Sequence, residues 1–389
     1  MKEKINELAG SVEAEVIAHR NHLHAHPELS FQEAETSAYI RRVLDRYGVP
    51  YTGVDGCYSV IARLKGQKPG KTIAFRADID ALALQEENDG PYRSKNDGVM
   101  HACGHDGNTA CLLGLARIFS ENLDLIEGKV VLIFQHAEEQ LPGGAIYLVE
   151  NGVMKDVDVI FGAHLSVPSE IGTIRYNKGV LMASADRFGI TLRGRGGHGA
   201  FPQEATDSLL AGAMLVQQLQ SIVSRNVDTL IPAVLSVCCF KSGTAFNVIP
   251  EHCEIGGTVR TCDESTRALI KRRVHEIAEG TAQTYGLTCE IDYEMGYPVL
   301  FCDADTVDKA VEGISRLTSH QPLESAPLMG GEDFAYFTSE KPGAYFFIGC
   351  GNKGKGIVGA HHSPHFDIDE RALRIAMETL LAVYFSAKE

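Results

Sequence analysis

The sequence predicts an α/β protein in which a discontinuous domain with a mostly parallel sheet is interrupted by a smaller α+β domain. The first half alternates helical patterns with continuous apolar strands, which is typical of a parallel sheet covered by helices on both faces. The middle follows the order strand, helix, strand, strand, helix, strand, which is the ferredoxin-like split motif. With 389 residues, the chain is also long enough to build two hydrophobic cores.

The elements of the larger domain lie before and after the insertion. Helical periodicity is found at 4–24, 32–47 and 109–119, and apolar strands at 72–75, 130–134 and 157–162. After the insertion the chain returns to Gly-rich loops, then to an apolar strand at 344–349 and a closing helix at 370–386. We therefore assign residues 1–185 and 298–389 to one discontinuous domain.

The inserted domain is expected at 186–297. Strand patterns in this region occur at 187–193, 233–240, 254–260 and 288–293. Amphipathic or charged helical patterns separate them at 207–224 and 264–285. These six elements supply the strands and helices of the split motif.

Charge and composition exclude several classes of protein. The chain holds 36 Lys and Arg against 51 Asp and Glu, and its net charge of -15 would repel nucleic-acid phosphates. Its 44% hydrophobic content is that of a globular protein rather than a disordered one. No run of about 18 apolar residues indicates a membrane span, and the charged N-terminus lacks the apolar core of a signal peptide. Ten scattered Cys form no disulfide scaffold, so we expect a cytoplasmic protein with reduced thiols.

Polar side chains follow the predicted strands of the larger domain. Asp78 and Asp80 come after the strand at 72–75, the pair Glu138-Glu139 follows the strand at 130–134, and His164 follows the strand at 157–162. In open α/β sheets, ligands bind outside the carboxyl ends of the strands. We therefore expect these side chains to converge on one site, although they are far apart in the sequence.

The loop from Met100 to Asp106 concentrates metal-ligand residue types just before a helix. Cys103 and His105 are separated by one residue, so both could reach one ion or two neighbouring ions, with Cys103 as a thiolate. A buried structural Cys with Asp106 as a helix cap is the alternative from local sequence. A nucleophilic Cys103 is a further alternative, but the sequence offers no separate His and Asn pair to activate it.

Two more segments carry candidate ligands, and one carries a false signal. Adjacent carboxylates such as Glu138 and Glu139 can divide labour, one binding a metal and the other moving protons. Three His occur within 361–365, where Gly359 and Pro364 indicate a fixed turn. The segment 194–199 fits the pattern G-x-G-x-x-G, but no acidic residue for a ribose follows the next strand, so a dinucleotide site is not expected.

Taken in order, the motifs resemble the aminoacylase/carboxypeptidase family of dinuclear metallohydrolases. The resemblance runs from Arg20 to Asp369 and is nearest to the branch of amidohydrolases that cleave N-acyl-amino acids, hippurate and auxin conjugates. The motifs are Arg20-x-x-x-His24-x-x-Pro27-Glu28, Arg76-Ala-Asp78-x-Asp80-Ala-Leu82, Met100-His-Ala-Cys103-Gly-His105-Asp106, Phe134-Gln-x-Ala-Glu138-Glu139, Gly197-His198-Gly-Ala, Phe246-Asn247-Val-Ile-Pro250, Gly257-Thr-Val-Arg260, Glu332-Asp333-Phe334 and His362-Ser-Pro364.

The resemblance implies a role for each matching residue. Two divalent ions (Zn, Mn, Co or Ni) would be bound by Cys103, His105, Glu139, His164 and His362. Glu138 would be the general base, and Asp78 would orient a ligand imidazole. His198 would reach the active site of the partner subunit in a homodimer, where it steadies the oxyanion. Asn247 and Arg260 would contact the substrate from the inserted domain, which would serve as a lid and dimerisation domain.

Some positions depart from the family pattern, and several functions share its catalytic residues. Ala83 and His136 stand where the family usually has Pro, and one extra residue follows Glu139, so the acyl preference stays open. The expected substrate is an N-acyl-L-amino acid or a dipeptide-like relative, with no nucleic-acid or membrane partner. A dipeptidase or a deacetylase of acylated diaminopimelate is the alternative within hydrolases. A non-catalytic metal-binding protein is the alternative outside them.

Overall fold

The protein, analysed as a computed structural model that describes residues 1–388, divides into two compact units. Unit 1 comprises Met1–Leu181, Phe301–Ala326 and the chain from Asp333, and unit 2 comprises Met182–Leu300 and Pro327–Glu332. The predicted boundaries at 186 and 297 lie close to these bounds. The segment Pro327–Glu332 differs, because the sequence placed it in the larger domain and the structure groups it with unit 2.

Unit 1 contains a mixed sheet whose centre is parallel. The strands β4, β3, β5 and β16 run parallel to one another, whereas β2 is antiparallel to β4 and β6 is antiparallel to β16. From edge to edge the order is β1 (Tyr51–Gly53), β2 (Val60–Lys65), β4 (Glu127–Gln135), β3 (Lys68–Asp78), β5 (Val159–Glu170), β16 (Gly343–Gly351), β6 (Ile174–Tyr176) and β15 (Leu323–Glu324). A separate two-stranded ladder joins β14 (Leu300–Cys302) and β7 (Gly179–Met182).

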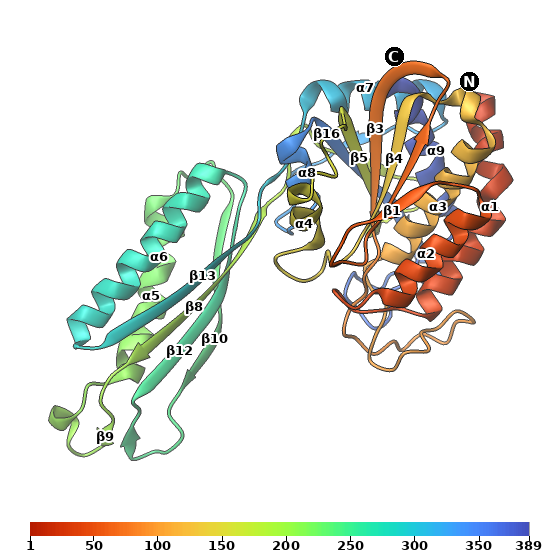
Figure 1. Cartoon of the computed structure of the whole chain (residues 1–389). Helices are drawn as coiled ribbons and strands as arrows, with labels where there is room; N and C mark the ends of the chain where they lie inside the picture. Colours follow the sequence, from red (N-terminus) through yellow and green to blue (C-terminus); the bar gives the residue numbers. More distant parts are fainter. Residues whose placement is uncertain (389) are drawn as a thin grey trace. The chain divides into compact units, whose positions relative to one another are not determined.

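Helices of unit 1 pack on both faces of this sheet (Figure 1). Gly162 and Leu165 of β5 point to opposite faces, since they are an odd number of residues apart. A Cβ on Gly162 would lie 3.1 Å from the ring of Phe334, directly before α8, whereas a Cβ on Gly107 of α3 would lie 2.3 Å from Leu165. The helices are α1 (Lys2–Ala25), α2 (Ala34–Arg46), α3 (His105–Glu121), α4 (Gly144–Glu150), α7 (Ala304–Leu317), α8 (Ala335–Glu340) and α9 (Arg371–Ala387).

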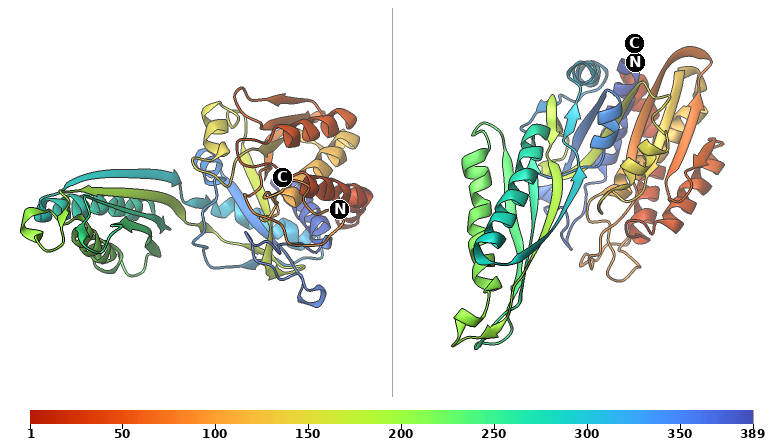
Figure 2. Two further views of the ribbon diagram at one scale, coloured as in Figure 1. Left: turned by 90° about the horizontal axis from the view of Figure 1, so that it is seen from below. Right: turned by 60° about the vertical axis from the view of Figure 1, so that its left-hand side comes forward.

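Helix α7 was missed by the sequence analysis, which expected loops between Tyr297 and the strand at 344–349. Its signal was nevertheless present, because buried Val307, Ala310 and Ile314 recur at helical spacing. Asp303 begins the helix by accepting a hydrogen bond from the Thr306 backbone N–H at 2.8 Å. The first and last long helices, α1 and α9, pack against each other, and both chain ends lie in the same region of unit 1 (Figure 2).

Unit 2 has the strand order of the predicted ferredoxin-like motif. Its antiparallel sheet has the order β10 (Ala233–Ser242), β12 (His252–Thr261), β8 (Ser184–Arg193) and β13 (Thr288–Tyr297). Helices α5 (Ser208–Asn226) and α6 (Glu264–Tyr285) lie side by side along one face (Figure 1). Alternate strand residues such as Ile190, Ile255 and Val259 pack with Leu215 and Ile270 of the helices into a separate core. A short ladder pairs β9 (Gly197–His198) with β11 (Val248–Ile249).

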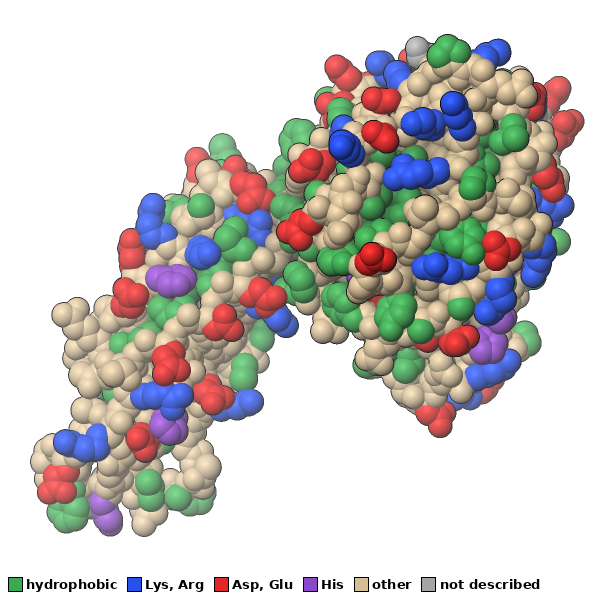
Figure 3. Space-filling model, in the orientation of Figure 1, with side chains coloured by type: hydrophobic (Ala, Val, Ile, Leu, Met, Phe, Trp, Pro, Cys, Tyr) green, Lys and Arg blue, Asp and Glu red, His purple; other side chains and the backbone are tan. Residues whose placement is uncertain are grey.

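Two features are relevant to the membrane and nucleic-acid partners that the sequence analysis did not expect. Among residues 1–388, no helix combines the length and apolar character that a bilayer crossing requires. On the face drawn in Figure 3, acidic and basic side chains are interspersed and do not gather into one basic surface.

Candidate metal centre

The predicted site residues of unit 1 converge at the carboxyl edge of its parallel strands. Asp78 ends β3, the loop after β4 carries Glu138 and Glu139, and His164 lies in β5. His105 is the first residue of α3, and Cys103 precedes it. The side chains meet because parallel strands direct their following loops to the same edge of the sheet.

The distances join the five expected ligands and Glu138 into one cluster. Cys103 Sγ lies 3.6 Å from His164 Nε2, and His362 Nε2 lies 3.2 Å from Glu139 Oε1. His105 Nε2 is 3.9 Å from a carboxylate oxygen of both Glu138 and Glu139. Three overlapping triplets have donor atoms within 4.8 Å of one another: Cys103, His105 and His164; Cys103, Glu139 and His362; His105, Glu138 and Glu139.

Two backbone carbonyls orient the ligand imidazoles. His105 Nδ1 donates to the Asp80 carbonyl oxygen at 3.0 Å, and His164 Nδ1 donates to the Leu165 carbonyl oxygen at 2.7 Å. Since the Nδ1 atoms carry the protons in these bonds, it is the Nε2 atoms that face the cluster, and each would offer its lone pair to a metal once the ring is neutral. The sequence analysis gave the orienting role to Asp78, but the contact with His105 Nδ1 is made by Asp80.

Asp78 is fixed from two sides within the same cluster. One carboxylate oxygen accepts from Asn108 Nδ2 at 2.9 Å and the other from Arg76 at 2.8 Å. The second oxygen also lies 3.7 Å from His105 Nε2. Burial alone would raise the pKa of Asp78, but His105 and Arg76 outweigh it and lower that pKa. Asp78 therefore stays ionised beside the ligand atom of His105.

His361 is a member of the cluster that the sequence analysis passed over in favour of His362. Its Nδ1 lies 3.7 Å from Cys103 Sγ, nearly the same distance as the 3.6 Å between that sulfur and His164 Nε2. Its Nε2 accepts a hydrogen bond from the Val167 backbone N–H at 3.3 Å. That acceptor role places the proton on Nδ1, which then donates to the sulfur. Burial, followed by the nearby His164, lowers the pKa of His361 to about 3, so the ring is neutral. The three His within 361–365 indicated that this turn is part of the site, but their spacing could not show which of the adjacent imidazoles, His361 or His362, binds a metal and which supports Cys103.

Carboxylates surround the ligand atoms Cys103 Sγ and His105 Nε2. Burial raises the pKa of the Cys103 thiol well above its ordinary value, and the carboxylates of Glu139, Glu138 and Asp78 raise it further. Burial would lower the pKa of His105, but Asp78 and other carboxylates raise it to about 10. Buried carboxylates around the two ligand atoms contribute to both shifts. Cations at this place would offset their negative charge.

The donor atoms fit a metal centre. His105 Nε2 and Glu139 Oε1 are buried, and neither has a hydrogen-bond partner among the described residues. Unpaired buried polar atoms are costly, so atoms of this kind at a functional site indicate a missing partner. One thiol, three imidazoles and one carboxylate match the mixed sulfur, nitrogen and oxygen ligands of Zn, Mn, Co or Ni.

A buried ionic layer supports the loop that carries Cys103 and His105. Asp106 accepts from Arg20 Nε at 2.9 Å and lies 2.7 Å from His24 Nδ1, while His24 Nε2 lies 3.2 Å from Glu86. Burial would lower the pKa of His24, and Arg20 lowers it too, but Asp106 and Glu86 raise it. This layer accounts for the burial of Arg20 and His24, two residues of the first family motif.

The predicted residues of the insertion lie in unit 2. His198 in β9 pairs with Val248 of β11, and the Gly199 N–H donates to the Asn247 carbonyl oxygen at 2.8 Å, so His198 and Asn247 are neighbours. Both are exposed. Arg260 lies in β12, where one of its nitrogens donates to the Val259 carbonyl oxygen at 3.0 Å.

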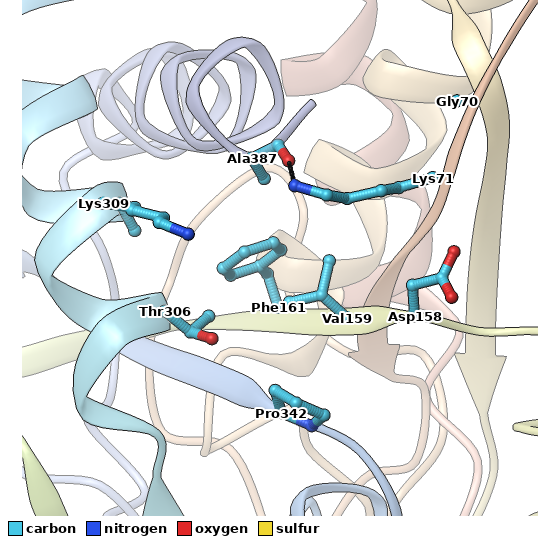
Figure 4. A pocket seen from close by; sticks show the side chains of 10 residues that line it. Gly70, Lys71, Asp158, Val159, Phe161, Thr306, Lys309, Pro342 and Ala387 are labelled. Atoms are coloured by element: carbon cyan, nitrogen blue, oxygen red, sulfur yellow. Dashed lines mark hydrogen bonds between the residues drawn. The ribbon is translucent and has the colours of Figure 1, made fainter. Parts of the chain in front are cut away.

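A larger hollow in unit 1 is separate from the metal centre. It measures about 370 Å³ and is lined by residues at the amino end of β5, including Asp158 and Phe161, and by Lys71 and Lys309 (Figure 4). Lys71 Nζ donates to the Ala387 carbonyl oxygen at 2.8 Å. None of the predicted metal ligands lines this hollow, so it is not part of the metal centre.

Comparison with known proteins identifies the family. A sequence model of peptidase family M20/M25/M40 matches residues 74–385. The chain belongs to this family. It is therefore a hydrolase of the M20 peptidases, and the resemblance inferred from its motifs is confirmed.

Individual relatives match nearly the whole chain. An N-acyl-L-amino acid amidohydrolase of Geobacillus stearothermophilus is 50% identical over 327 residues, which are 83% of this chain and 88% of that protein. An N-acetylcysteine deacetylase of Bacillus subtilis is 41% identical over 360 residues, 92% of this chain and 93% of that protein. The crystal structure of the YXEP protein of B. subtilis, a dinuclear metal binding peptidase from the M20 family, matches at a TM-score of 0.83 and 36% identity over 96% of this chain and 98% of that chain. This likeness confirms the predicted α/β fold with a mostly parallel sheet.

Proposed function

We propose that this M20 peptidase is a metal-dependent amidohydrolase that cleaves the amide bond of N-acyl-L-amino acids. The observation that carries the proposal is the convergence of five metal-ligand side chains and the Glu138 carboxylate at one edge of the sheet. The names of two relatives, an N-acyl-L-amino acid amidohydrolase and an N-acetylcysteine deacetylase, support this substrate class.

Two divalent ions are part of the proposal. Cys103, His105, Glu139, His164 and His362 would hold them, and the mixed ligand set suits Zn, Mn, Co or Ni. When bound, such a pair of ions lowers the pKa of a shared water and polarises the scissile carbonyl. The description of the YXEP protein as a dinuclear metal binding peptidase supports the number of ions.

Within the cluster, Glu138 is proposed as the group that moves protons. Its carboxylate lies 3.9 Å from His105 Nε2 and is mostly buried, so it would face the attacking water from a site of low solvent content. Glu138 would take a proton from that water and return it to the leaving amine nitrogen. Asp78, held by Arg76 and Asn108, would keep the His105 ring in place as the charge of the site changes.

Unit 2 would supply the remaining groups as a lid and dimerisation domain. Arg260 and Asn247 would hold the substrate carboxylate, and His198 would donate to the oxyanion in the active site of the partner subunit of a homodimer. Exposed Phe201, three residues after His198, and exposed Phe246, which precedes Asn247, support an interface there. Sedimentation equilibrium tests the dimer, and a monomer at all concentrations would remove His198 from this role. Ten free cysteines support a cytoplasmic, reducing location.

The substitution Glu138→Gln tests the proposed base. We expect it to lower kcat for N-acetyl and N-benzoyl amino acids by about 100-fold or more while metal content stays at the wild-type value, because the amide keeps the shape but cannot accept a proton. Glu150→Gln in α4, away from the cluster, is the matched control and should leave kcat unchanged. Near-wild-type turnover of Glu138→Gln with full metal content would exclude Glu138 as the base.

A further inference from the structure

The sheet of unit 2 has one covered and one open face. Helices α5 and α6 pack against the covered face, where Ile255 and Val259 of β12 enter the core. The alternate residues of β12 point to the other face, which is hollowed into a pocket of about 520 Å³. Both cysteines of the pair Cys238-Cys239 line this pocket. Adjacent residues of a regular strand cannot do so, because they point to opposite faces.

A β-bulge in β10 explains how both thiols reach one face. Val237 pairs with Gly257 and Cys239 pairs with Gly256, so Cys238 is an extra residue without a partner of its own. Because Gly256 and Gly257 are neighbours on β12, they face opposite sides, and so do Val237 and Cys239. The bulge therefore turns Cys239 to the same open face as Cys238. Among the described residues no other pair of adjacent cysteines exists.

Bare backbone forms the floor beside the two thiols. Across the sheet, one row of paired residues reads Cys239, Gly256, Gly189 and Asp292. A Cβ at Gly189 would meet nothing within 4 Å, and one at Gly256 would make ordinary contacts with the Cys239 Cβ at 3.4 Å and the Phe188 carbonyl oxygen at 3.7 Å. The packing of unit 2 therefore does not require these glycines. Glycine inside a strand at such a place lets another group approach the backbone closely.

Cationic side chains line the same pocket. Arg187 is paired with Glu294, but Arg260 has no carboxylate within ion-pair distance among residues 1–388. Arg260 and Cys238 line this pocket together, and burial lowers the pKa of Arg260. Cys238 Sγ donates to the Ser236 carbonyl oxygen at 3.6 Å, and the side chain is exposed.

We propose that Cys238 and Cys239 form a two-sulfur binding site for thiophilic ions, separate from the metal centre in unit 1 and adjacent to Arg260. A soft divalent cation would bind both sulfurs with release of two protons. Trivalent arsenic would bind in the same way: phenylarsine oxide forms two As–S bonds, arsenic stays trivalent, and its oxygen leaves as water with the two thiol protons.

Intact-protein mass spectrometry with phenylarsine oxide tests the site in the metal-loaded full chain. We expect one phenylarsenic group per chain, removed by a dithiol but not by a monothiol. Cys238→Ser and Cys239→Ser should each abolish the stable adduct, because one sulfur cannot hold arsenic in two bonds. Cys57→Ser and Cys289→Ser, which remove partly exposed single cysteines, should retain it. An adduct that survives in both single variants of the pair would overturn the proposal.

The position beside Arg260 adds a second readout, which rests on the proposed function. If Arg260 holds the substrate carboxylate, the adduct should raise KM about tenfold with little change in kcat, which is the size of one lost charge-assisted hydrogen bond. Cys239→Ser should show no such response to the reagent. A full adduct with unchanged KM would overturn the link to Arg260. Failure of the proposed function is distinguishable, because the untreated protein would then hydrolyse no N-acyl amino acid while the adduct still formed.

Discussion

His361 donates a hydrogen bond to the sulfur of Cys103, and a backbone N–H determines which ring nitrogen carries the proton. Val167 donates to Nε2, so Nδ1 carries the proton and faces the sulfur. A hydrogen bond of this kind stabilises a thiolate and therefore a metal that the thiolate binds. The residue thus acts on the metal centre without being one of its expected ligands.

His361→Phe should weaken metal binding by about 10- to 100-fold, the usual effect of removing a group that supports a ligand. The ring keeps its place against Phe366 but loses the donor to Cys103. Competition with a chelator of known affinity measures the change. His365→Phe is the control, because His365 is exposed and lies 3.2 Å from Glu87, away from the cluster. Equal affinities for His361→Phe and wild type would remove the support role.

Glu33 makes the stability of the metal-free protein depend on pH near neutrality. Its carboxylate accepts from the Phe31 N–H at 3.0 Å and the Ala137 N–H at 2.8 Å, two residues with positive φ. Burial raises the pKa of Glu33, and the nearby Asp80 carboxylate raises it further, to about 7. Because this folded-state value exceeds the unfolded one, the stabilisation is complete below about pH 4.5 and is lost as the pH rises through 7.

Glu33→Gln should remove this dependence while keeping an oxygen that accepts from Phe31 and Ala137. Urea unfolding of chelator-treated protein at pH 5 and pH 8 gives the free energy of unfolding of each form. The wild type should lose up to about 3 kcal/mol more than the variant between these values, from about 1.4 kcal/mol per pKa unit. Other titrating groups cancel in the comparison. Parallel pH profiles would contradict the assignment.

The ligand types could be predicted from the sequence because strand ends and residue chemistry are local signals. Cys103 lies just before a predicted helix, Glu139 and His164 follow the strands predicted at 130–134 and 157–162, and their convergence follows from parallel topology, although β5 in fact continues past His164 to Glu170. The residues that orient each ligand side chain could not be predicted in the same way. Their identity depends on which ring nitrogen meets which carbonyl, as at His105 and Asp80, and that is set by packing between distant segments.

Helix α3, which begins at His105, is held in place by close packing at a glycine. A Cβ on Gly114 would lie 2.6 Å from Val16 Cγ2 of α1 and 2.8 Å from Met377 Sδ of α9. The three helices therefore approach at a distance that only glycine permits. Since the expected ligand His105 is the first residue of α3, this packing also fixes the position of His105 in the metal centre.

Gly114→Ala should destabilise the protein by about 1–3 kcal/mol, because overpacking outweighs the gain of about 1 kcal/mol in helix propensity. Gly280→Ala is the matched control, since Gly280 lies in the interior of α6 and a Cβ there would meet nothing within 4 Å. That variant should gain up to about 1 kcal/mol. Thermal unfolding measures the stability of each variant relative to the wild type. A stabilised Gly114→Ala variant would contradict the prediction and show that the three helices can move apart without cost.

At the scale of elements, periodicity predicted nearly every long helix and central strand. Most of the elements it missed, such as β1, β2, β6, α4 and α8, are short, and α7 lies in a region that was expected to form loops. The bulge at Cys238 lay beyond sequence reasoning for a different reason. One extra residue in a strand does not remove the alternation of hydrophobic and polar residues before and after it. The position of the bulge is therefore seen only in the pairing of β10 with β12.

The whole molecule consists of two units with separate cores, joined where the chain enters and leaves unit 2. Ala185 of β8 and Tyr297 of β13 are register partners, so the ends of the insertion lie next to each other. A unit with adjacent ends and its own core can be removed without stretching the rest of the chain. All five expected metal ligands belong to unit 1, whereas His198, Asn247 and Arg260 belong to unit 2.

Joining Ala185 to Tyr297 through a short Gly/Ser linker should therefore leave a folded unit 1 that binds metal with wild-type stoichiometry. The same protein should hydrolyse no N-acyl amino acid, because the groups proposed to hold the substrate are gone. The excised fragment Ser184–Tyr297 should unfold cooperatively by itself, since α5 and α6 cover its core. Circular dichroism and metal analysis measure these outcomes. Turnover by the shortened chain would place substrate binding entirely in unit 1, and an unfolded fragment would show that its core depends on the segment at 327–332.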